Sequence, residues 1–479
     1  MTTATVAAAS LPLAGSTTAA PAAITITVDA DATGGRVLPE HFLGLSWEAD
    51  QLHQSWIDDD TGSLAALMRN LGPGTTRYSA NAVDNTAWHP DAPEGTTAPV
   101  ITAADLARAG DLAHATGWSV DLGVNLGAND PAAAADEVRA AQQEFGPMLR
   151  SVQIGNQPDF FALSQLEPYD HQTYLQQVHA YRTAIDAAAE GIRFAGPDSA
   201  MTAGALPLGQ AYEPYARTWR AAYLNAFAGQ SDFLNQHYYP LVKTPGGNTA
   251  AIVDQLTSRA IADADRAYIE DLVNEAAAAG VEPHLSETNS VAGGGQAGVS
   301  NTFGAALWTV DYLLTAASSG IAGVNMHQQP HDCGSYTWVC FPDGSATLHA
   351  QPAYYAGLLV SQLRGGTFLP TEVSDPNANI SAHALRMPDG HIKVVVENAG
   401  PGPQPAVDVR VEGSTTTTAT AQWLTAPSPY ATSDVRFADS RVGADGSFTP
   451  GPARQLSTES GAVAIDFVAP SAVLLNLTD

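Results

Sequence analysis

The sequence predicts an α/β fold in two parts: a (β/α)8 barrel of the TIM type, then a C-terminal antiparallel β-sandwich that includes an N-terminal strand. Three observations carry this prediction. The chain has 479 residues, too many for one ordinary domain. Short apolar runs alternate with helical patterns as far as residue 362. From Leu363 onward, strand-like runs separated by turn residues replace them.

Eight apolar runs are the expected barrel strands. They cover residues 41–47, 75–79, 118–125, 150–155, 191–196, 231–237, 283–287 and 321–327. Between them, apolar residues at helical spacing predict helices over 63–71, 103–117, 169–189, 260–279 and 302–318. Strict alternation of strand and helix predicts a parallel sheet. Eight repeats predict that the sheet closes into a barrel.

The expected sandwich strands follow the barrel. They cover residues 381–387, 391–398, 406–411, 418–424, 462–468 and 472–477. A further strand over 23–28 precedes the barrel, and we expect it to pair with the sandwich. The predicted boundaries are therefore a leader at 1–22, a joining strand at 23–40, the barrel at 41–362 and the sandwich at 363–479.

Export is expected from the start of the chain. Residues 1–22 are rich in Ala, Ser and Thr, like the end of a secretory signal, although no Lys or Arg precedes Arg36. We interpret them as a truncated signal or a flexible leader and expect a secreted or extracellular protein, periplasmic or cell-surface included. Cys333 and Cys340 are either two reduced thiols or a disulfide worth about 2–3 kcal/mol, and export favours the disulfide.

The charge limits the partners. The net charge is −29, and Lys243 and Lys393 are the only lysines. Such a surface repels nucleic acid and long sulfated glycans, but a single acidic sugar remains compatible because salt screens distant charges over ~10 Å. No apolar run reaches the ~18 residues of a membrane span. No Cys/His metal spacing occurs, and we expect neither a metal nor a cofactor.

Two segments carry chemistry. The stretch 153–159 (QIGNQPD) follows the fourth strand, where Gly-Asn-Glu-Pro would be the acid/base signature of a retaining glycosidase. Here Gln157 stands in place of the Glu. The stretch 284–290 (HLSETNS) ends the seventh strand and carries Glu287. Both strand ends open into one central pocket, where retaining glycosidases need two carboxyls ~5 Å apart.

The chain resembles glycoside hydrolase family 79, the β-glucuronidase and heparanase family, from residue 23 to residue 479. The carrying motifs are GLSWE at 44–48, LGPG at 71–74, IGNQPD at 154–159, HYYP at 237–240, SETNS at 286–290, GGG at 293–295, GVNMH at 323–327 and PAYYAG at 352–357. The resemblance implies a retaining barrel enzyme with a β-sandwich formed partly from the N-terminal strand.

The resemblance also implies roles for single residues. Glu287 takes the nucleophile position and Gln157 the acid/base position. Backbone N–H groups of Gly293 and Gly294 would hold a uronate carboxylate, together with Tyr336 from the loop after strand eight.

Further pocket residues are expected from their positions and from two differences between this chain and the family pattern. Asn156 is expected to bind the sugar 2-hydroxyl. Ala292 stands where relatives often have a Tyr, and the segment 77–84 lacks their Gly pair. Sugar-hydroxyl ligands and pocket-lining residues are then expected among Glu48, Asn81, Asp84, His237, Tyr239, His327 and His331.

The amide of Gln157 leaves three interpretations open. In the first interpretation, which we favour, it is a deliberate Glu→Gln change made to trap a substrate or intermediate. It is natural, with a leaving group that needs no proton. Or it is natural, in a protein that binds sugar without cleaving it. The expected function is a retaining, exo-acting β-glucuronidase in an acid/base-disabled form. The alternatives are a β-glycosidase for a neutral or modified sugar, and a non-catalytic carbohydrate-binding pseudoenzyme.

Overall fold

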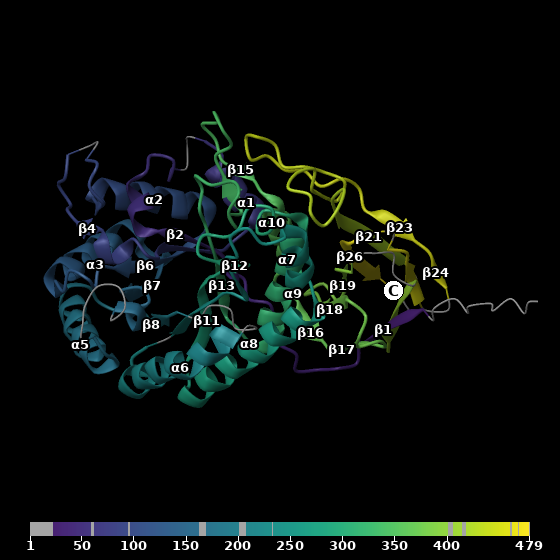
Figure 1. The fold of residues 1–479 in the computed structure, drawn as a ribbon, viewed down its shortest axis with the longest axis horizontal. Helices are drawn as coiled ribbons and strands as arrows, with labels where there is room; N and C mark the ends of the chain where they lie inside the picture. Colours follow the sequence, from purple (N-terminus) through teal and green to yellow (C-terminus); the bar gives the residue numbers. More distant parts are fainter. Residues whose placement is uncertain are drawn as a thin grey trace, which may run out of the picture.

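The computed structural model describes residues 23–58, 62–93, 96–161, 169–200, 207–231, 233–400, 406–413, 418–459, 462–467 and 469–478. A barrel surrounded by helices lies at one end of the molecule and a β-sandwich at the other (Figure 1). The leader predicted at 1–22 lies outside the described residues. No helix of the described part is long and apolar enough to cross a membrane.

The predicted closed barrel of eight parallel strands is confirmed. In order around the barrel, the strands are β2 (Leu43–Glu48), β3 (Thr75–Ser79), β6 (Ser119–Val124), β7 (Leu149–Ile154), β8 (Phe194–Ser199), β9 (Phe233–Tyr238), β11 (Glu282–Thr288) and β13 (Gly323–His327). The barrel closes between β13 and β2, where Met326 lies opposite Leu45. All eight strands fall within or beside the predicted runs.

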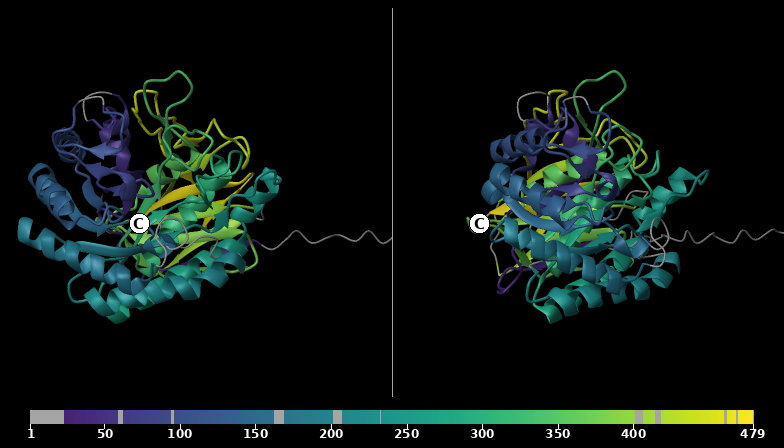
Figure 2. Two further views of the ribbon diagram at one scale, coloured as in Figure 1. Left: turned by 60° about the vertical axis from the view of Figure 1, so that its left-hand side comes forward. Right: turned by 90° about the vertical axis from the view of Figure 1, so that its left-hand side faces the viewer.

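Helices cover the outside of the barrel (Figure 2). They are α1 (Leu64–Leu71), α2 (Ala103–Thr116), α3 (Pro131–Phe145), α5 (His171–Ala188), α6 (Pro207–Phe227), α7 (Thr249–Leu256), α8 (Arg259–Ala279), α9 (Phe303–Ser319) and α10 (Pro352–Ser361). The sequence did not predict α3, α6, α7 and α10. In α10 every residue from Pro352 to Val360 is buried, so no polar face marks its helical period.

The inside of the barrel is polar near the ends of its strands. Side chains alternate between the two faces of a strand. On β2, Leu45 and Trp47 pack into the apolar core between strands and helices. Ser46 instead points to the barrel axis, where it accepts a hydrogen bond from Arg77. This alternation places the functional side chains on the axis.

Two sheets form the sandwich. The larger contains β16 (Thr367–Leu369), β18 (Ile380–Arg386), β19 (Ile392–Asn398), β26 (Ser471–Thr478), β21 (Thr418–Thr425), β22 (Arg436–Phe437) and β23 (Arg454–Leu456). The other has the order β17 (Thr371–Val373), β1 (Ile24–Asp29), β20 (Val407–Glu412), β25 (Ala462–Ile465) and β24 (Thr458–Glu459). Both ends of the chain therefore contribute to the sandwich, as predicted.

One part of the sandwich prediction is wrong. β1 pairs antiparallel with β17 but parallel with β20, so this sheet is mixed rather than purely antiparallel. No hairpin connects β1 to either neighbour, because it comes from the other end of the chain. Its direction is therefore not fixed by a tight turn.

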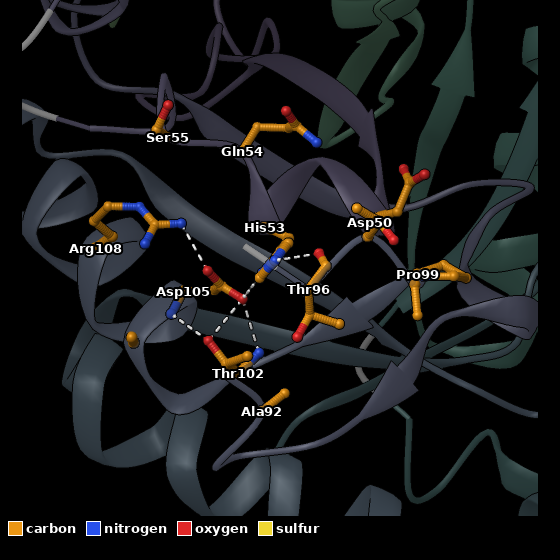
Figure 3. A pocket seen from close by; sticks show the side chains of 13 residues that line it. Asp50, His53, Gln54, Ser55, Ala92, Thr96, Pro99, Thr102, Asp105 and Arg108 are labelled. Atoms are coloured by element: carbon orange, nitrogen blue, oxygen red, sulfur yellow. Dashed lines mark hydrogen bonds and ion pairs between the residues drawn. The ribbon is translucent and has the colours of Figure 1, made fainter. Parts of the chain in front are cut away.

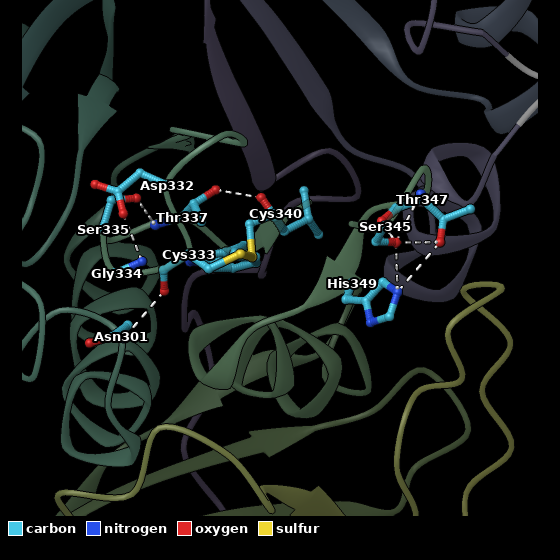
Figure 4. The surroundings of a disulfide bond; sticks show 12 residues. Asn301, Asp332, Cys333, Gly334, Ser335, Thr337, Cys340, Ser345, Thr347 and His349 are labelled. Atoms are coloured by element: carbon cyan, nitrogen blue, oxygen red, sulfur yellow. Dashed lines mark hydrogen bonds between the residues drawn. A yellow bond between two sulfur atoms is a disulfide. The ribbon is translucent and has the colours of Figure 1, made fainter. Parts of the chain in front are cut away.

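Cys333 and Cys340 form a disulfide in the loop after β13 (Figure 4). The bonded loop contains Tyr336. Outside the loop, the Asn301 side chain donates a hydrogen bond to the Cys333 carbonyl at 3.2 Å. The disulfide therefore restricts a loop that carries a predicted site residue.

We expect the double variant Cys333→Ser/Cys340→Ser to lose about 2–3 kcal/mol of unfolding free energy, because its unfolded chain regains the conformational entropy that the disulfide removes. Chemical denaturation without reductant measures this. Adding reductant should destabilise the original chain by the same amount and should leave the stability of the double variant unchanged. Equal denaturation midpoints for the two proteins would contradict the prediction.

Candidate active site

Glu287 lies at the carboxyl end of β11, at the centre of the barrel. It is 4% exposed. Its Oε2 accepts a hydrogen bond from Arg77 Nη1 at 2.9 Å, and its Oε1 accepts one from the Tyr239 hydroxyl at 2.9 Å. Nδ1 of His237 lies 3.8 Å from the same Oε1. The two oxygens are thus surrounded by groups from two other parts of the barrel, β3 and the end of β9.

These neighbours keep Glu287 ionised. Burial alone would raise the pKa of its carboxyl, but His237, His327 and Arg77, with the Tyr239 hydrogen bond, reverse that effect. The net result is a pKa well below the usual range of a Glu. A carboxylate that is ionised at neutral pH and held in a fixed orientation is what a nucleophile in this position requires.

Arg77 on β3 organises the pocket floor and was missed as a site residue. It is fully buried. Besides Glu287, it donates to Gln153 Oε1 at 2.8 Å, Ser46 Oγ at 2.9 Å and Asn156 Oδ1 at 2.9 Å. A usable signal was present in the sequence, because an Arg within an apolar barrel strand has to find buried partners.

Gln157 occupies the predicted acid/base position directly after β7. Its backbone is left-handed, with φ 47°, and its N–H donates to the Asp198 carbonyl at 3.0 Å. Its side-chain nitrogen lies 2.9 Å from His237 Nδ1, the same atom that approaches Glu287. Gln157 and Glu287 therefore meet one imidazole nitrogen from two sides, and Gln157 is the more exposed of the two.

His237 is fully buried between these residues. Its Nε2 lies 3.4 Å from Asp198 Oδ1 and 3.3 Å from Arg77 Nη2. Asp198 also accepts a hydrogen bond from Ser286 Oγ at 2.5 Å. Asp198 is a second residue that the sequence did not point to, since nothing in its local pattern indicates a residue beneath the site.

Asn156 and Asn81 lie together. Asn156 Nδ2 donates to Asn81 Oδ1 at 3.3 Å, and Asn81 is exposed. Asp84 is placed differently from a sugar ligand. Its Oδ1 accepts from the backbone N–H groups of Leu126 and Gly127 at 2.9 and 3.2 Å, and its Oδ2 accepts from that of Asn156 at 3.0 Å. Asp84 thus anchors the backbone behind Asn156.

A second buried carboxylate anchors the other side of the Gln157 turn. Both carboxylate oxygens of Asp159 accept from the Ala200 N–H, at 3.1 and 3.0 Å, and Oδ2 also accepts from the Tyr212 hydroxyl at 2.6 Å. Burial raises the pKa of Asp159 to about 6 and that of Asp84 to about 7. Both carboxyls accept hydrogen bonds from backbone N–H groups and thereby anchor the backbone around Gln157.

Glu48 and His327 form a pair on the opposite side of the pocket. Glu48 Oε1 lies 3.4 Å from His327 Nε2, and Glu48 Oε2 accepts from the Ala82 N–H at 2.7 Å. Burial would lower the pKa of His327, but Glu287 and Glu48 raise it above its ordinary value. Their negative charges thus favour the protonated imidazole.

Tyr239, Ala292 and Tyr336 form a small apolar cluster. The rings of Tyr239 and Tyr336 are 6.0 Å apart. Short strands β10 (Leu241–Val242) and β12 (Val291–Ala292) pair in parallel beside this cluster. They bring the exposed Lys243 next to the turn that begins at Gly293.

The turn at Gly293 and Gly294 borders open space. Both residues have left-handed backbones, with φ 81° and 87°. A Cβ added at Gly294 would meet no atom within 4 Å, and one at Gly293 would meet only the Lys243 side chain, at 3.9 Å. The turn can therefore approach a ligand closely. His331, by contrast, stacks on Phe341 at 5.2 Å, and no described contact joins it to Glu287.

A pocket of about 920 Å³ adjoins this end of the barrel, between the 3-10 helix η1 (Ala49–His53) that follows Glu48 and the start of α2. His53, Thr102, Asp105 and Arg108 point toward one another in it (Figure 3). Asp105 accepts hydrogen bonds from the other three. The charges of His53, Asp105 and Arg108 are thus paired with one another, and Asp50 is a further carboxylate in the lining of the pocket.

One group of described carboxylates, Glu213, Asp271 and Glu275, is compact enough to hold a metal ion. It lies on helices α6 and α8, away from the strand ends. Arg217 and Arg220 form ion pairs with all three carboxylates. These guanidinium groups already supply the positive charge that an ion would bring.

Comparison with known proteins gives short sequence matches and extensive structural ones. No protein-family model matches the chain. A stretch of 92 residues, 19% of the chain, is 37% identical to a β-glucuronidase of Neurospora crassa and covers 15% of that protein. A stretch of 88 residues, 18% of the chain, is 38% identical to a β-glucuronidase of Aspergillus niger and covers 16% of it. The chain thus matches about a sixth of each relative's length.

Among solved structures, the 4-O-α-L-rhamnosyl-β-D-glucuronidase of Fusarium oxysporum has a TM-score of 0.75 at 19% identity, over 95% of this chain and 100% of that one. A family 51 α-L-arabinofuranosidase of Bifidobacterium longum has a TM-score of 0.71 at 16% identity, over 95% and 99% of the chains. These structural likenesses establish a shared barrel-and-sandwich fold.

We expect Arg77→Met to destabilise the protein by about 3–5 kcal/mol at neutral pH, because it leaves buried Glu287 without its cation. The pKa of Glu287 is depressed in the folded state. The ion pair therefore contributes stability above the ordinary Glu pKa of roughly 4.3 and loses it as the pH falls through the folded value. The deficit of the variant should shrink in acid.

Chemical denaturation across a pH series measures this deficit. Arg139→Met is the matched control, since Arg139 and Asp136 form an ion pair at the surface and its loss should cost at most about 1 kcal/mol. A deficit for Arg77→Met that does not change with pH would refute the electrostatic explanation.

Proposed function

We propose that the chain is a retaining β-glycosidase that removes terminal β-glucuronic acid from glycosides or glycans. One observation carries the proposal: an ionised, buried Glu287 and the side chain at position 157 meet the same nitrogen of His237. This geometry suits two groups on either side of one anomeric carbon, at the roughly 5 Å separation of a retaining pair.

In the proposed reaction, Glu287 attacks the anomeric carbon. Arg77 and Tyr239 hold its two oxygens, which aims the carboxylate before substrate arrives. Asn156, oriented by Arg77 and by the Asp84 anchor, binds the 2-hydroxyl. That contact strengthens as charge develops on the sugar ring in the transition state.

Two observations support a uronate rather than a neutral sugar. Both sequence relatives are named β-glucuronidases. In addition, the open turn at Gly293 and Gly294 has exposed Lys243 beside it, and Lys243 is one of only two lysines in this acidic chain. A cation next to accessible backbone N–H groups favours a carboxylate ligand.

Specific observations favour two other functions. Ala292 and the likeness to an α-L-arabinofuranosidase favour a neutral or modified sugar. The amide of Gln157 favours a protein that binds carbohydrate without cleaving it. We extend the main proposal to an exported protein, because the disulfide between Cys333 and Cys340 suits an oxidising compartment.

The test compares hydrolysis of phenyl β-glucuronide by this chain and by its Gln157→Glu variant, with phenyl β-glucoside as the control. We expect the variant to gain about 10²–10⁴-fold on the glucuronide alone, because a carboxylic acid restores proton donation. An equal gain on the glucoside would favour the neutral-sugar function. Sugar binding without hydrolysis by either form would favour the pseudoenzyme.

We also expect Lys243→Gln to weaken binding of glucuronide relative to glucoside by about tenfold, the size of one lost charge-assisted hydrogen bond. Calorimetric titration of both sugars measures the ratio. Lys393→Gln is the matched control, because Lys393 lies in the sandwich and donates to the Gln362 carbonyl. An unchanged ratio in Lys243→Gln would remove Lys243 from uronate recognition.

A further inference from the structure

The residue at position 157 restricts which bonds the site can break. Resting on the function proposed above and on Gln157 being the natural residue of the chain, we propose that the natural substrates of this site are glycosides of acidic aglycones, namely carboxylic acids joined through an ester oxygen and acidic phenols. Such aglycones depart as stable anions. The inference concerns the leaving group, whereas the proposed function concerns the sugar.

The first step of the argument is that Gln157 has no proton to give. Its amide nitrogen is 2.9 Å from His237 Nδ1, so the two groups satisfy each other. His237 is fully buried, and its other nitrogen faces Asp198 and Arg77. Neither side chain therefore presents a free acidic proton to an oxygen entering from the open side of the pocket.

The second step is that the acidic groups described around Gln157 are committed elsewhere. Asp84 and Asp159 are buried with raised pKa values, but their oxygens receive backbone N–H groups and the Tyr212 hydroxyl. Glu287 is ionised. Each carboxyl thus has a positioning or nucleophilic task that a proton transfer to the aglycone would disturb.

The third step is that the machinery for nucleophilic attack is intact. Arg77 and Tyr239 hold both oxygens of Glu287, and the carboxylate stays charged although it is 4% exposed. Removing a charge this completely from water is costly even when the charge is paired. The intact nucleophile favours a reaction whose first step needs no acid over simple binding.

The bond changes balance without a proton donor. An oxygen of Glu287 forms a bond to the anomeric carbon, and the bond from that carbon to the aglycone oxygen breaks. The electron pair leaves with the aglycone, which departs as a carboxylate or phenolate. Water then attacks the anomeric carbon, the bond to Glu287 breaks, and the water proton passes to solvent.

Hydrolysis of the sugar bound to Glu287 should be slow, and the reason is again the missing carboxyl group at position 157. Position 157 carries no carboxylate to deprotonate the attacking water. A small anion needs no such base. Azide should therefore intercept the sugar bound to Glu287 and form a glycosyl azide with retained configuration.

The experiment measures kcat/KM for dinitrophenyl, nitrophenyl and phenyl β-glucuronides with this chain and with Gln157→Glu. We expect the two proteins to be similar on the dinitrophenyl substrate. With increasing basicity of the phenol, this chain should fall behind by about 10²–10⁴-fold, the usual contribution of general acid catalysis. Azide should accelerate turnover of the dinitrophenyl substrate by this chain and yield the glycosyl azide.

Gln172→Glu is the matched control. It makes the same change at an exposed residue of α5, and it should leave the dependence on the leaving group unaltered. An acyl β-glucuronide and its phenyl counterpart then test the proposed class directly. This chain should cleave the acyl compound much faster than the phenyl compound.

Each possible result either supports or overturns the inference. Equal dependence on the phenol in this chain and in Gln157→Glu overturns the inference, since another group would then donate the proton. So does turnover of the dinitrophenyl substrate by Gln157→Glu alone. If no protein cleaves any of these glucuronides, the proposed function fails before the question of the leaving group arises.

Discussion

The guanidinium of Arg77 holds together the polar centre of the barrel. Its N–H groups reach Ser46 on β2, Gln153 at the end of β7, Asn156 just beyond it and Glu287 on β11. A buried guanidinium is costly unless its donors are all satisfied, so these four acceptors define one low-energy arrangement. The position of Glu287, and with it the chemistry of the site, follows from that arrangement.

Two buried carboxylates secure the turn that carries Gln157. Asp84, before the turn, accepts a hydrogen bond from the backbone N–H of Asn156. Asp159, after the turn, accepts one from the backbone N–H of Ala200. Between them, Gln157 adopts a left-handed backbone that costs a residue other than Gly roughly 1 kcal/mol. The surrounding hydrogen bonds offset this strain. The shape of the turn therefore depends on these anchors rather than on the chemical nature of side chain 157.

Much of this fold could be predicted from sequence because the signals are local. The barrel strands are apolar runs, and Glu287 ends one of them. Arg77 and Asp198 were not predicted as site residues, because their importance comes from strands that meet only after the barrel closes. Asp84 was predicted as a sugar ligand. Its polar character was read correctly, but its partners Leu126 and Gly127 belong to a distant loop that no local pattern connects to it.

The position of β1 has a consequence for synthesis. β1 lies between β17 and β20, so the first described strand of the chain is an interior member of a sheet completed by late strands. A ribosome releases β1 before the barrel and releases its neighbours only after the barrel. While the barrel folds, the hydrogen-bonding edges of β1 wait unpaired, and the order of assembly runs opposite to the order of translation. Strands that emerge after the barrel secure the strand that precedes it.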